Sequence, residues 1–439
     1  MAESPSGSRY AWGIVTLLAA AYVLSFVDRQ VLGLLITPIK QSMQLSDTEI
    51  GLLMGPAFAI FYVTLGWPIG WLADRANRRN IIAAGVALWS LMTMGCGLSR
   101  TFTQLFVTRI GVGVGEAALT PSALSIIVDM FPPVVRPRAI SFYTNGIYIG
   151  SGLAYLVGGA VIGAVSGAGT VAVPIAGALE GWQVAFLVVG APGLIVALAV
   201  MCIREPVRTG AAHSELPDAQ SARYLFTRWK AFGAPCIGMC ATTIVTYLGG
   251  WYTPLLQRVW DWPVERIGFW LGVNYLVFGP LGTTVAGLLA ERMARRGIAD
   301  APYRLLVWGT VLVGVSATLL PLAPSPELVV VAQAVFVFAG AVTSPMAATA
   351  IVELAPARLR AQATAIYFLI INLVGLLAGP TLVGVFADRV FTTPTGIAPS
   401  IAVVSFGAAL PALLALWLGS KSYATEITTM SAAPSPGST

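Results

Sequence analysis

Twelve apolar stretches, each of a length that can cross a membrane, constrain this chain more than any other feature. They cover approximately residues 12–37, 48–72, 80–98, 103–129, 138–163, 182–203, 232–256, 265–290, 304–323, 327–353, 361–387 and 399–420. A helix needs about 20 residues to cross roughly 30 Å of hydrocarbon. The stretches are too continuous for barrel strands. The sequence therefore predicts an all-α integral membrane protein with twelve transmembrane helices.

The composition excludes the water-soluble classes of protein. Hydrophobic residues make up 57% of the chain and charged residues 10%, whereas soluble domains are about 25% charged. So little charge cannot cover the surface of a soluble enzyme, a nucleic-acid-binding protein or a disordered regulator. We attribute the net charge of +6 to basic loops on one membrane face and expect no nucleic-acid partner.

Lysine and arginine are unevenly distributed between the two sides of the predicted membrane. With the N-terminus inside, 18 of the 25 fall in inner segments, five in outer loops and two, Arg29 and Arg109, within spans. Inner loops of membrane proteins carry this excess. We expect both termini in the cytoplasm and the chain in the cell (inner) membrane. The first apolar run is too long for a signal peptide and lacks a cleavage site, so it should remain as a helix.

The two halves of the chain repeat each other. The segment 70–79 matches 287–296 in its acid and its basic residues, and 120–143 matches 344–367 in its prolines, acid and tyrosine. A parallel six-helix repeat is typical of transporters that rock about a midplane site. We expect two pseudo-symmetric six-helix bundles, at 1–203 and 232–420, joined by a cytoplasmic linker at 204–231 and followed by a disordered tail at 421–439.

The repeated segment Gly70–Arg79 resembles the loop signature of the major facilitator superfamily, with Asn77 where glycine is usual; either residue tolerates a left-handed turn. Leu105–Gly115 resembles the superfamily's helix-four signature. The resemblance covers essentially all twelve spans and implies the major facilitator fold and a transporter.

Three short segments resemble one branch of that family, the Spinster-type lipid transporters. They are Phe26–Arg29, Arg109–Ala117, and Ser141–Tyr143 together with Gly150–Tyr155. This resemblance implies lysolipids or sphingoid phosphates as cargo. The family's antiporter-associated motif has Gly-Pro before its paired glycines, but here Ala154-Tyr155 precede Gly158-Gly159. Antiport and symport therefore both stay open.

Four ionisable residues lie well within spans: Asp28, Arg29, Arg109 and Glu116. Each unpaired charge costs at least about 2.5–3.5 kcal/mol at the bilayer centre. Asp28 and Glu116 lie roughly 24 Å and 21 Å along their helices, so both approach the midplane. We expect Arg29 to lie near Glu116, Asp28 and Glu116 to exchange protons, and Arg29 and Arg109 to hold a substrate headgroup or form ion pairs. The alternative is a permanent ion pair that only fixes helix packing.

The second half has no charge at comparable depth, which suggests an amphiphilic cargo with its headgroup on Arg29. The residues expected to line the substrate cavity are Tyr22, Ser25, Asn145, Tyr148, Thr246, Tyr247, Asn274, Tyr275, Tyr367 and Asn372. The alternative for each is a hydrogen bond to backbone or to another of these side chains.

The loop after the second span predicts a conformational latch. Asp74 lies at a helix end beside Arg75 and Arg78, and Arg138 follows the fourth span. Contacts of this kind break when two bundles rock, so they bias the balance between outward-open and inward-open states. The alternative is that these arginines only set the topology.

These observations predict a proton-coupled secondary transporter of an amphiphilic, lipid-like anion or zwitterion that works by alternating access. We expect a monomer with no cofactor, metal or enzymatic activity, because the single His213 and four scattered cysteines form no catalytic or metal-binding group. The alternatives are a proton-coupled drug exporter, a small organic-anion transporter and, less favoured, a gradient-independent lipid scramblase.

Overall fold

In the computed structural model, the described residues are 9–73, 75–132, 134–166, 170–173, 177–208, 227, 229–355 and 360–432. Within these ranges, 12 helices are long and apolar enough to cross a membrane, which confirms the predicted fold class. They run over Arg9–Met43, Asp47–Ala73, Arg78–Leu98, Phe102–Met130, Arg136–Gly163, Gly181–Met201, Ala231–Trp260, Val264–Arg295, Ala301–Leu322, Pro326–Leu354, Ile366–Arg389 and Ile397–Thr429.

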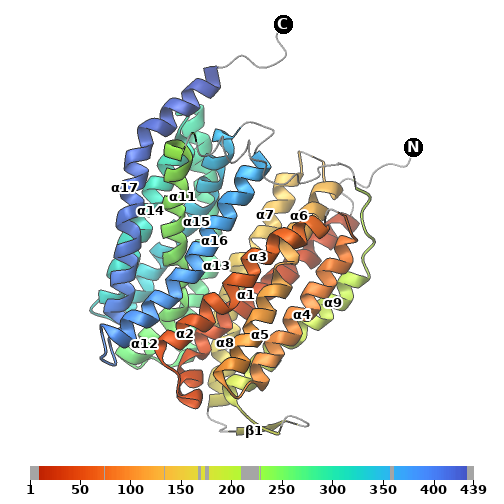
Figure 1. Cartoon of the computed structure of the whole chain (residues 1–439), viewed down its shortest axis with the longest axis vertical. Helices are drawn as coiled ribbons and strands as arrows, with labels where there is room; N and C mark the ends of the chain where they lie inside the picture. The colour runs from red at the N-terminus through yellow and green to blue at the C-terminus, as the bar shows by residue number, and fades with distance from the viewer. Residues whose placement is uncertain are drawn as a thin grey trace. The chain divides into compact units, whose positions relative to one another are not determined.

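The elements follow one another along the chain as labelled in Figure 1. Those of the first sequence half are α1 (Arg9–Met43), α2 (Asp47–Met54), α3 (Pro56–Ala73), α4 (Arg78–Leu98), α5 (Phe102–Glu116), α6 (Leu119–Met130), α7 (Arg136–Thr144), α8 (Gly146–Ser166), β1 (Thr170–Val173), β2 (Gly177–Glu180) and α9 (Gly181–Met201). Those of the second half are α11 (Trp229–Thr246), η1 (Tyr247–Trp251), α12 (Tyr252–Trp260), α13 (Val264–Arg295), α14 (Ala301–Leu319), η2 (Leu320–Leu322), α15 (Pro326–Leu354), α16 (Arg360–Arg389) and α17 (Ile397–Ala432).

Several spans are broken into two helices, and one break lies at the predicted site. α5 ends at Glu116 and α6 begins at Leu119. The backbone N–H of Ala117 still bonds to the carbonyl of Gly113, but that of Ala118 bonds three residues back to Gly115. This tightening of the last turn is usual where an α-helix ends. The regular hydrogen bonding of the helix is therefore interrupted directly after Glu116.

The first compact unit comprises the described residues of Met1–His213, Gly250–Leu276 and Pro380–Thr395. Within it α4 lies beside α9, α1 packs on α8, and α3 packs on α5 (Figure 1). Glycines allow the close approaches: a methyl group on Gly97 would lie 2.4 Å from the carbonyl oxygen of Gln183 in α9. Small residues at helix contacts are the usual solution in membranes, where apolar surface alone does not drive association.

The turn between α1 and α2 in this unit is held by side chains from α12 and α16. Arg258 donates two hydrogen bonds of 2.8 Å to the carboxylate of Asp47, and Lys40 donates a third of 2.6 Å. The carboxylate of Asp388 accepts the backbone N–H of Thr48 at 2.6 Å, at the first turn of α2. Residues of the second sequence half therefore belong to this unit, although the repeat suggested division near 204–231.

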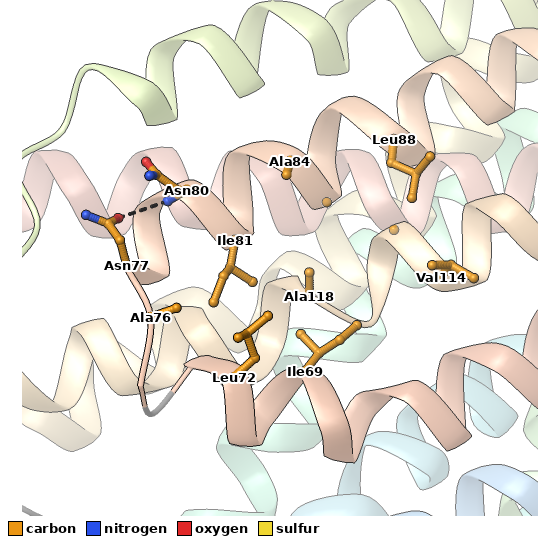
Figure 2. Close-up of a pocket in the computed structure, with 12 residues that line it drawn as sticks. Ile69, Leu72, Ala76, Asn77, Asn80, Ile81, Ala84, Leu88, Val114 and Ala118 are labelled. Carbon is orange, nitrogen blue, oxygen red and sulfur yellow. Dashed lines mark hydrogen bonds between the residues drawn. The ribbon is translucent and has the colours of Figure 1, made fainter.

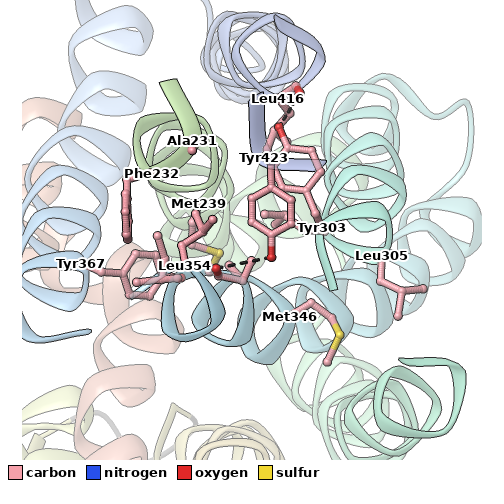
Figure 3. Close-up of a cluster of buried hydrophobic side chains, with 14 of the residues drawn as sticks. Ala231, Phe232, Met239, Tyr303, Leu305, Met346, Leu354, Tyr367, Leu416 and Tyr423 are labelled. Carbon is pink, nitrogen blue, oxygen red and sulfur yellow. Dashed lines mark hydrogen bonds between the residues drawn. The ribbon is translucent and has the colours of Figure 1, made fainter. Parts of the chain in front are cut away.

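The second compact unit comprises the described residues of Ser214–Gly249, Val277–Gly379 and Gly396–Thr439. α11 packs on α17, and α14 packs on α15 and α17. Figure 3 shows its core, where Tyr303 and Tyr423 stack at 4.4 Å between ring centroids. The Tyr303 hydroxyl donates to the carbonyl of Leu416, so this aromatic core has a satisfied polar group.

The structure differs from the sequence prediction in two segments outside the main helices. The prediction of disorder from residue 421 is wrong for 421–432, because α17 continues to Ala432. Tyr423 is fully buried and donates to the Glu353 carboxylate at 3.3 Å, which ties this extension to α15. The sequence reasoning also missed the antiparallel β1–β2 hairpin, which pairs Thr170 with Glu180. Of the predicted linker, residues 209–226 and 228 lie outside the described chain.

We predict that Gly115→Ala destabilises the protein while Gly66→Ala does not. A methyl group on Gly115 would lie 2.6 Å from the backbone nitrogen of Trp89 and 2.7 Å from the carbonyl oxygen of Gly85, both on α4. Backbone atoms cannot move aside, so overpacking should cost about 1–3 kcal/mol. A methyl group on Gly66 meets nothing within 4 Å. Thermal unfolding of both variants in detergent tests this, and equal midpoints would contradict it.

Candidate functional site

The candidate site is a group of charged side chains buried inside the first compact unit. Ser25, Asp28 and Arg29 share one face of α1 because they are spaced three and four residues apart. Arg109 and Glu116 come from α5. The exposed fractions of Asp28, Arg109 and Glu116 are only 2%, 3% and 2%. Two carboxylates and two guanidinium groups are thus gathered in a region that excludes water.

Arg29 and Glu116 form the ion pair expected from the sequence. The Nε and Nη2 atoms of Arg29 each lie 2.6 Å from Oε2 of Glu116. The hydroxyl of Ser25 donates to the same oxygen at 2.8 Å. One carboxylate oxygen therefore accepts three hydrogen bonds from α1, while Oε1 of Glu116 is buried with no hydrogen-bond partner among the described residues.

Aromatic rings enclose the Arg29 guanidinium. Its central carbon lies 4.8 Å from the ring centroid of Phe26, 4.6 Å from that of Phe58 and 4.5 Å from that of Tyr62. Phe58 and Tyr62 stack on each other at 5.0 Å. Cation–π contacts gain strength when the cation is desolvated. The rings therefore stabilise the cation and leave only 12% of its side chain exposed.

The second acid, Asp28, and the second cation, Arg109, make fewer polar contacts among the described residues. Oδ2 of Asp28 accepts a hydrogen bond of 3.2 Å from the hydroxyl of Thr93 in α4. In the described part of the chain, Oδ1 of Asp28 and Nε of Arg109 are buried without a hydrogen bond. Arg109 lies over the Phe58 ring, 5.6 Å from its centroid. A buried polar atom without a hydrogen bond destabilises a protein, and ionisable residues inside a membrane are therefore candidates for a functional role.

The predicted cavity residues of the first unit fall into two groups. Tyr22 stacks on Tyr143 with 4.5 Å between ring centroids. Tyr22 also contacts the Phe26 ring at 5.2 Å, and Phe26 in turn lies beside Arg29 of the ion pair. Tyr275 stacks on Tyr155 at 5.6 Å, and Asn274 beside it is buried. Asn145 and Tyr148, at the junction of α7 and α8, are half-buried.

The predicted cavity residues of the second unit bond mainly to one another or to their own helices. Tyr247 donates to Oδ1 of Asn372 at 3.3 Å, and Nδ2 of Asn372 donates to the Phe368 carbonyl. Thr246 donates to the carbonyl of Thr242. Tyr367 is buried in the hydrophobic cluster of Figure 3. These contacts match the alternative weighed above, and a role in binding cargo stays a prediction for these four residues.

The predicted latch residues separate in the structure. Arg78 is buried and bonds to the carboxylates of Asp129 and Glu205, the latter at 2.8 Å. Arg75 lies on the Trp71 ring at 4.2 Å, and Arg138 lies over the Trp12 ring at 5.6 Å. Asp74 is outside the described residues, so its latch role stays a prediction.

Sequence reasoning missed the residues that surround the charges: Phe26, Phe58, Tyr62 and Thr93. Phe58 and Tyr62 are four residues apart and so share one face of α3, which is a visible signal. An aromatic pair at this spacing is equally typical of ordinary helix packing. Only the contact with α1 shows that it faces a cation.

Comparison with known families identifies the chain. The model of the Major Facilitator Superfamily matches residues 18–299 and 236–432. The chain belongs to this superfamily. Its family and fold are those of a multi-pass membrane transporter.

Individual relatives confirm the Spinster resemblance predicted from the motifs. Protein spinster homolog 1 of Homo sapiens is 28% identical over 86% of this chain and 73% of its own length. An MFS-type efflux pump of Mycolicibacterium smegmatis is 29% identical over 96% of this chain and 95% of its own length.

A solved structure agrees over nearly the whole chain. The crystal structure of a bacterial homologue of the human lysosomal transporter Spinster, inward-facing and unoccupied, has a TM-score of 0.78 and 26% sequence identity. It covers 98% of this chain and 100% of that one. The likeness supports the Spinster branch within the superfamily.

We predict that Arg78→Gln lowers stability far more than Arg295→Gln, although the two arginines occupy the same position in the repeat. The exposed fraction of the Arg78 side chain is 1%, and its replacement removes the cation that contacts the Asp129 and Glu205 carboxylates. Breaking a buried ion pair in this way should cost about 3–5 kcal/mol. The Arg295 side chain is 75% exposed and pairs with Glu291 on its own helix, a pair worth roughly 0.3–0.5 kcal/mol. Thermal unfolding of the two variants tests this, and similar losses would contradict it.

Proposed function

We propose that this transporter moves an amphiphilic anion or zwitterion, of the lysolipid or sphingoid-phosphate type, by alternating access coupled to protons. The carrying observation is the buried pair of Arg29 and Glu116, joined by two contacts of 2.6 Å and enclosed by aromatic rings. A cation held this way can exchange one anionic partner for another. Asp28, buried nearby on α1, supplies a second carboxylate.

Proton coupling follows from competition for the Arg29 guanidinium. Burial favours the neutral form of a carboxyl group, and a neighbouring cation favours the charged form. When Glu116 is ionised it holds Arg29. When Glu116 is protonated, the guanidinium is released to an anionic headgroup, so proton and anion bind together. A cargo that also carries an ammonium group competes with the proton for the carboxylate, and exchange then becomes possible.

The lipid-like cargo is supported by the asymmetry of polar groups and by the Spinster resemblance. The charged residues lie on α1 and α5, whereas the predicted cavity residues of the second half, such as Thr246 and Tyr247, are uncharged. A headgroup on Arg29 and a tail on uncharged, aromatic surface would use both. The relative described as an efflux pump favours a second candidate, export of a hydrophobic compound.

Replacing either member of the pair should separate binding from coupling. We predict that Glu116→Gln abolishes uptake driven by a pH gradient but retains some binding, because the amide mimics a permanently neutral acid. Arg29→Ala should lose binding of anionic cargo, since among the described residues of α1 and α5 only Arg109 offers another buried cation. Proteoliposome uptake of a lysolipid panel, with and without a pH gradient, is the measurement, paired with binding in detergent.

Matched substitutions outside the site control for general damage. Glu265→Gln and Arg266→Ala alter exposed residues at the first turn of α13 and should leave uptake unchanged. Full gradient-driven uptake by Glu116→Gln would favour a purely structural ion pair. If the wild type moves lipid at the same rate with and without a pH gradient, the result would favour a scramblase. If the wild type transports hydrophobic drugs but not lysolipids, the result would favour the exporter.

We also propose that both termini face the cytoplasm of the cell (inner) membrane. The excess of lysine and arginine in alternate loops supports this orientation. A membrane-impermeant maleimide should then label His213→Cys only after permeabilisation and Thr393→Cys in intact cells, with native-cysteine labelling subtracted. The reverse pattern would overturn the orientation.

A further inference from the structure

An open apolar groove lies among α3, α4, α5 and the start of the segment after α5 in the first compact unit. Its volume is about 420 Å³, within the range of roughly 300–1,000 Å³ usual for ligand pockets. Ile69 and Leu72 of α3, Ala84 and Leu88 of α4, and Val114 of α5 line it (Figure 2). Ala84, Leu72 and Leu88 are exposed on membrane-spanning helices, so the groove opens toward lipid.

Two asparagines form the polar end of this groove. Figure 2 shows Asn77 and Asn80 at one end, with Leu88 and Val114 toward the other. Asn77 does not use the left-handed conformation that the sequence allowed: its φ is −71°, and its side-chain oxygen caps α4 by accepting the backbone N–H of Asn80. Neither Nδ2 group donates to another described residue, so both are available as donors.

Three arginines lie beside the polar end, and their guanidinium groups pair with no acid among the described residues; the backbone N–H of Arg79 donates to Glu205 at 3.0 Å. Nε of Arg79 donates to the side-chain oxygen of Asn80 at 3.1 Å. Arg208 donates to the carbonyl of Ala76, which lines the groove, at 2.6 Å. Arg75, next in sequence to Ala76, lies on the Trp71 ring. Three guanidinium groups beside amide donors form a site suited to a phosphate.

The length of the groove matches one leaflet of a bilayer. From Asn77 to Leu88 the chain advances 11 residues, or roughly 16 Å of helix. Half of the hydrocarbon thickness is about 15 Å. An apolar groove that begins at a cationic, amide-bearing end and stops at the middle of the membrane has the dimensions of one acyl chain.

We propose that this groove binds one acyl chain of an anionic phospholipid, with the lipid phosphate at Asn77, Asn80 and the flanking arginines. Positive side chains at the membrane surface attract anionic lipids, and each buried methylene adds to binding. The bound lipid bridges α3, α4 and α5 at the end of the first unit that carries the α3–α4 turn. The proposal is independent of the transported cargo, because Arg29 and Glu116 take no part in it.

The test compares dioleoyl phosphatidylglycerol with dioleoyl phosphatidylcholine added to the full chain in detergent, measured by native mass spectrometry and by thermal shift. The wild type should bind phosphatidylglycerol preferentially. Ala84→Trp, which fills the groove, should weaken this binding about tenfold or more, since each lost methylene contact costs several-fold in affinity. Ala84→Leu is measured beside it in case the tryptophan prevents folding. Ala160→Trp, on an exposed position of α8, should bind as the wild type does.

A second arm tests the headgroup. The double variant Arg75→Gln with Arg79→Gln should lose the preference for phosphatidylglycerol, whereas Arg292→Gln with Arg296→Gln, at the repeated positions, should keep it. Glycerol phosphate, which lacks acyl chains, should produce no shift. Equal binding of both lipids by the wild type, unchanged binding by both Ala84 variants, or a shift with glycerol phosphate alone would overturn the proposal.

Discussion

The contact between Arg29 and Glu116 is the interaction on which the centre of this molecule depends. Ionised side chains in a membrane are stable only with a partner, and here the partner comes from another helix. Nε and Nη2 of Arg29 converge on one oxygen of Glu116, which joins α1 to α5 at the buried site. Loss of either charge would leave the other stranded in a region without water. The packing of α1 on α5 therefore depends on one buried ion pair.

Two features surround this ion pair: aromatic rings next to Arg29 and a helix end at Glu116. Phe58 and Tyr62 stabilise the guanidinium through their ring faces, so Arg29 retains favourable contacts when its anionic partner changes. α5 ends at Glu116 itself, and the backbone hydrogen bonds beyond it are rearranged. Broken helices at membrane depth occur where transporters bind ions and substrates. The coupling proposed above would use both features, the ring-bound cation and the helix break.

The two copies of the internal repeat are similar in sequence, but their equivalent side chains differ in burial and in the residues they contact. Arg78 and Arg295 occupy equivalent positions, yet Arg78 is buried between Asp129 and Glu205, whereas Arg295 pairs on the surface with Glu291. The same motif therefore serves as a buried cross-link in one half and as an exposed pair in the other. The groove beside Asn77 adds to this difference, because the guanidinium groups next to it pair with no acid among the described residues. The two halves of the transporter thus place equivalent arginines in different surroundings.

The sequence by itself determined the twelve spans, the repeat and the four buried charges, because length, hydropathy and intramembrane charge follow directly from residue type. It also predicted that Arg29 meets Glu116, since both lie near the midplane on faces set by helical periodicity. Tertiary structure alone decided the rest. Aromatic side chains look alike whether they pack against a cation or against leucine, so the contact of Tyr62 with Arg29 was not visible. The extension of α17 to Ala432 was equally hidden, because it depends on Tyr423 finding Tyr303 and Glu353 on other helices. Local sequence specifies which segments become helices, but only packing specifies what each face touches.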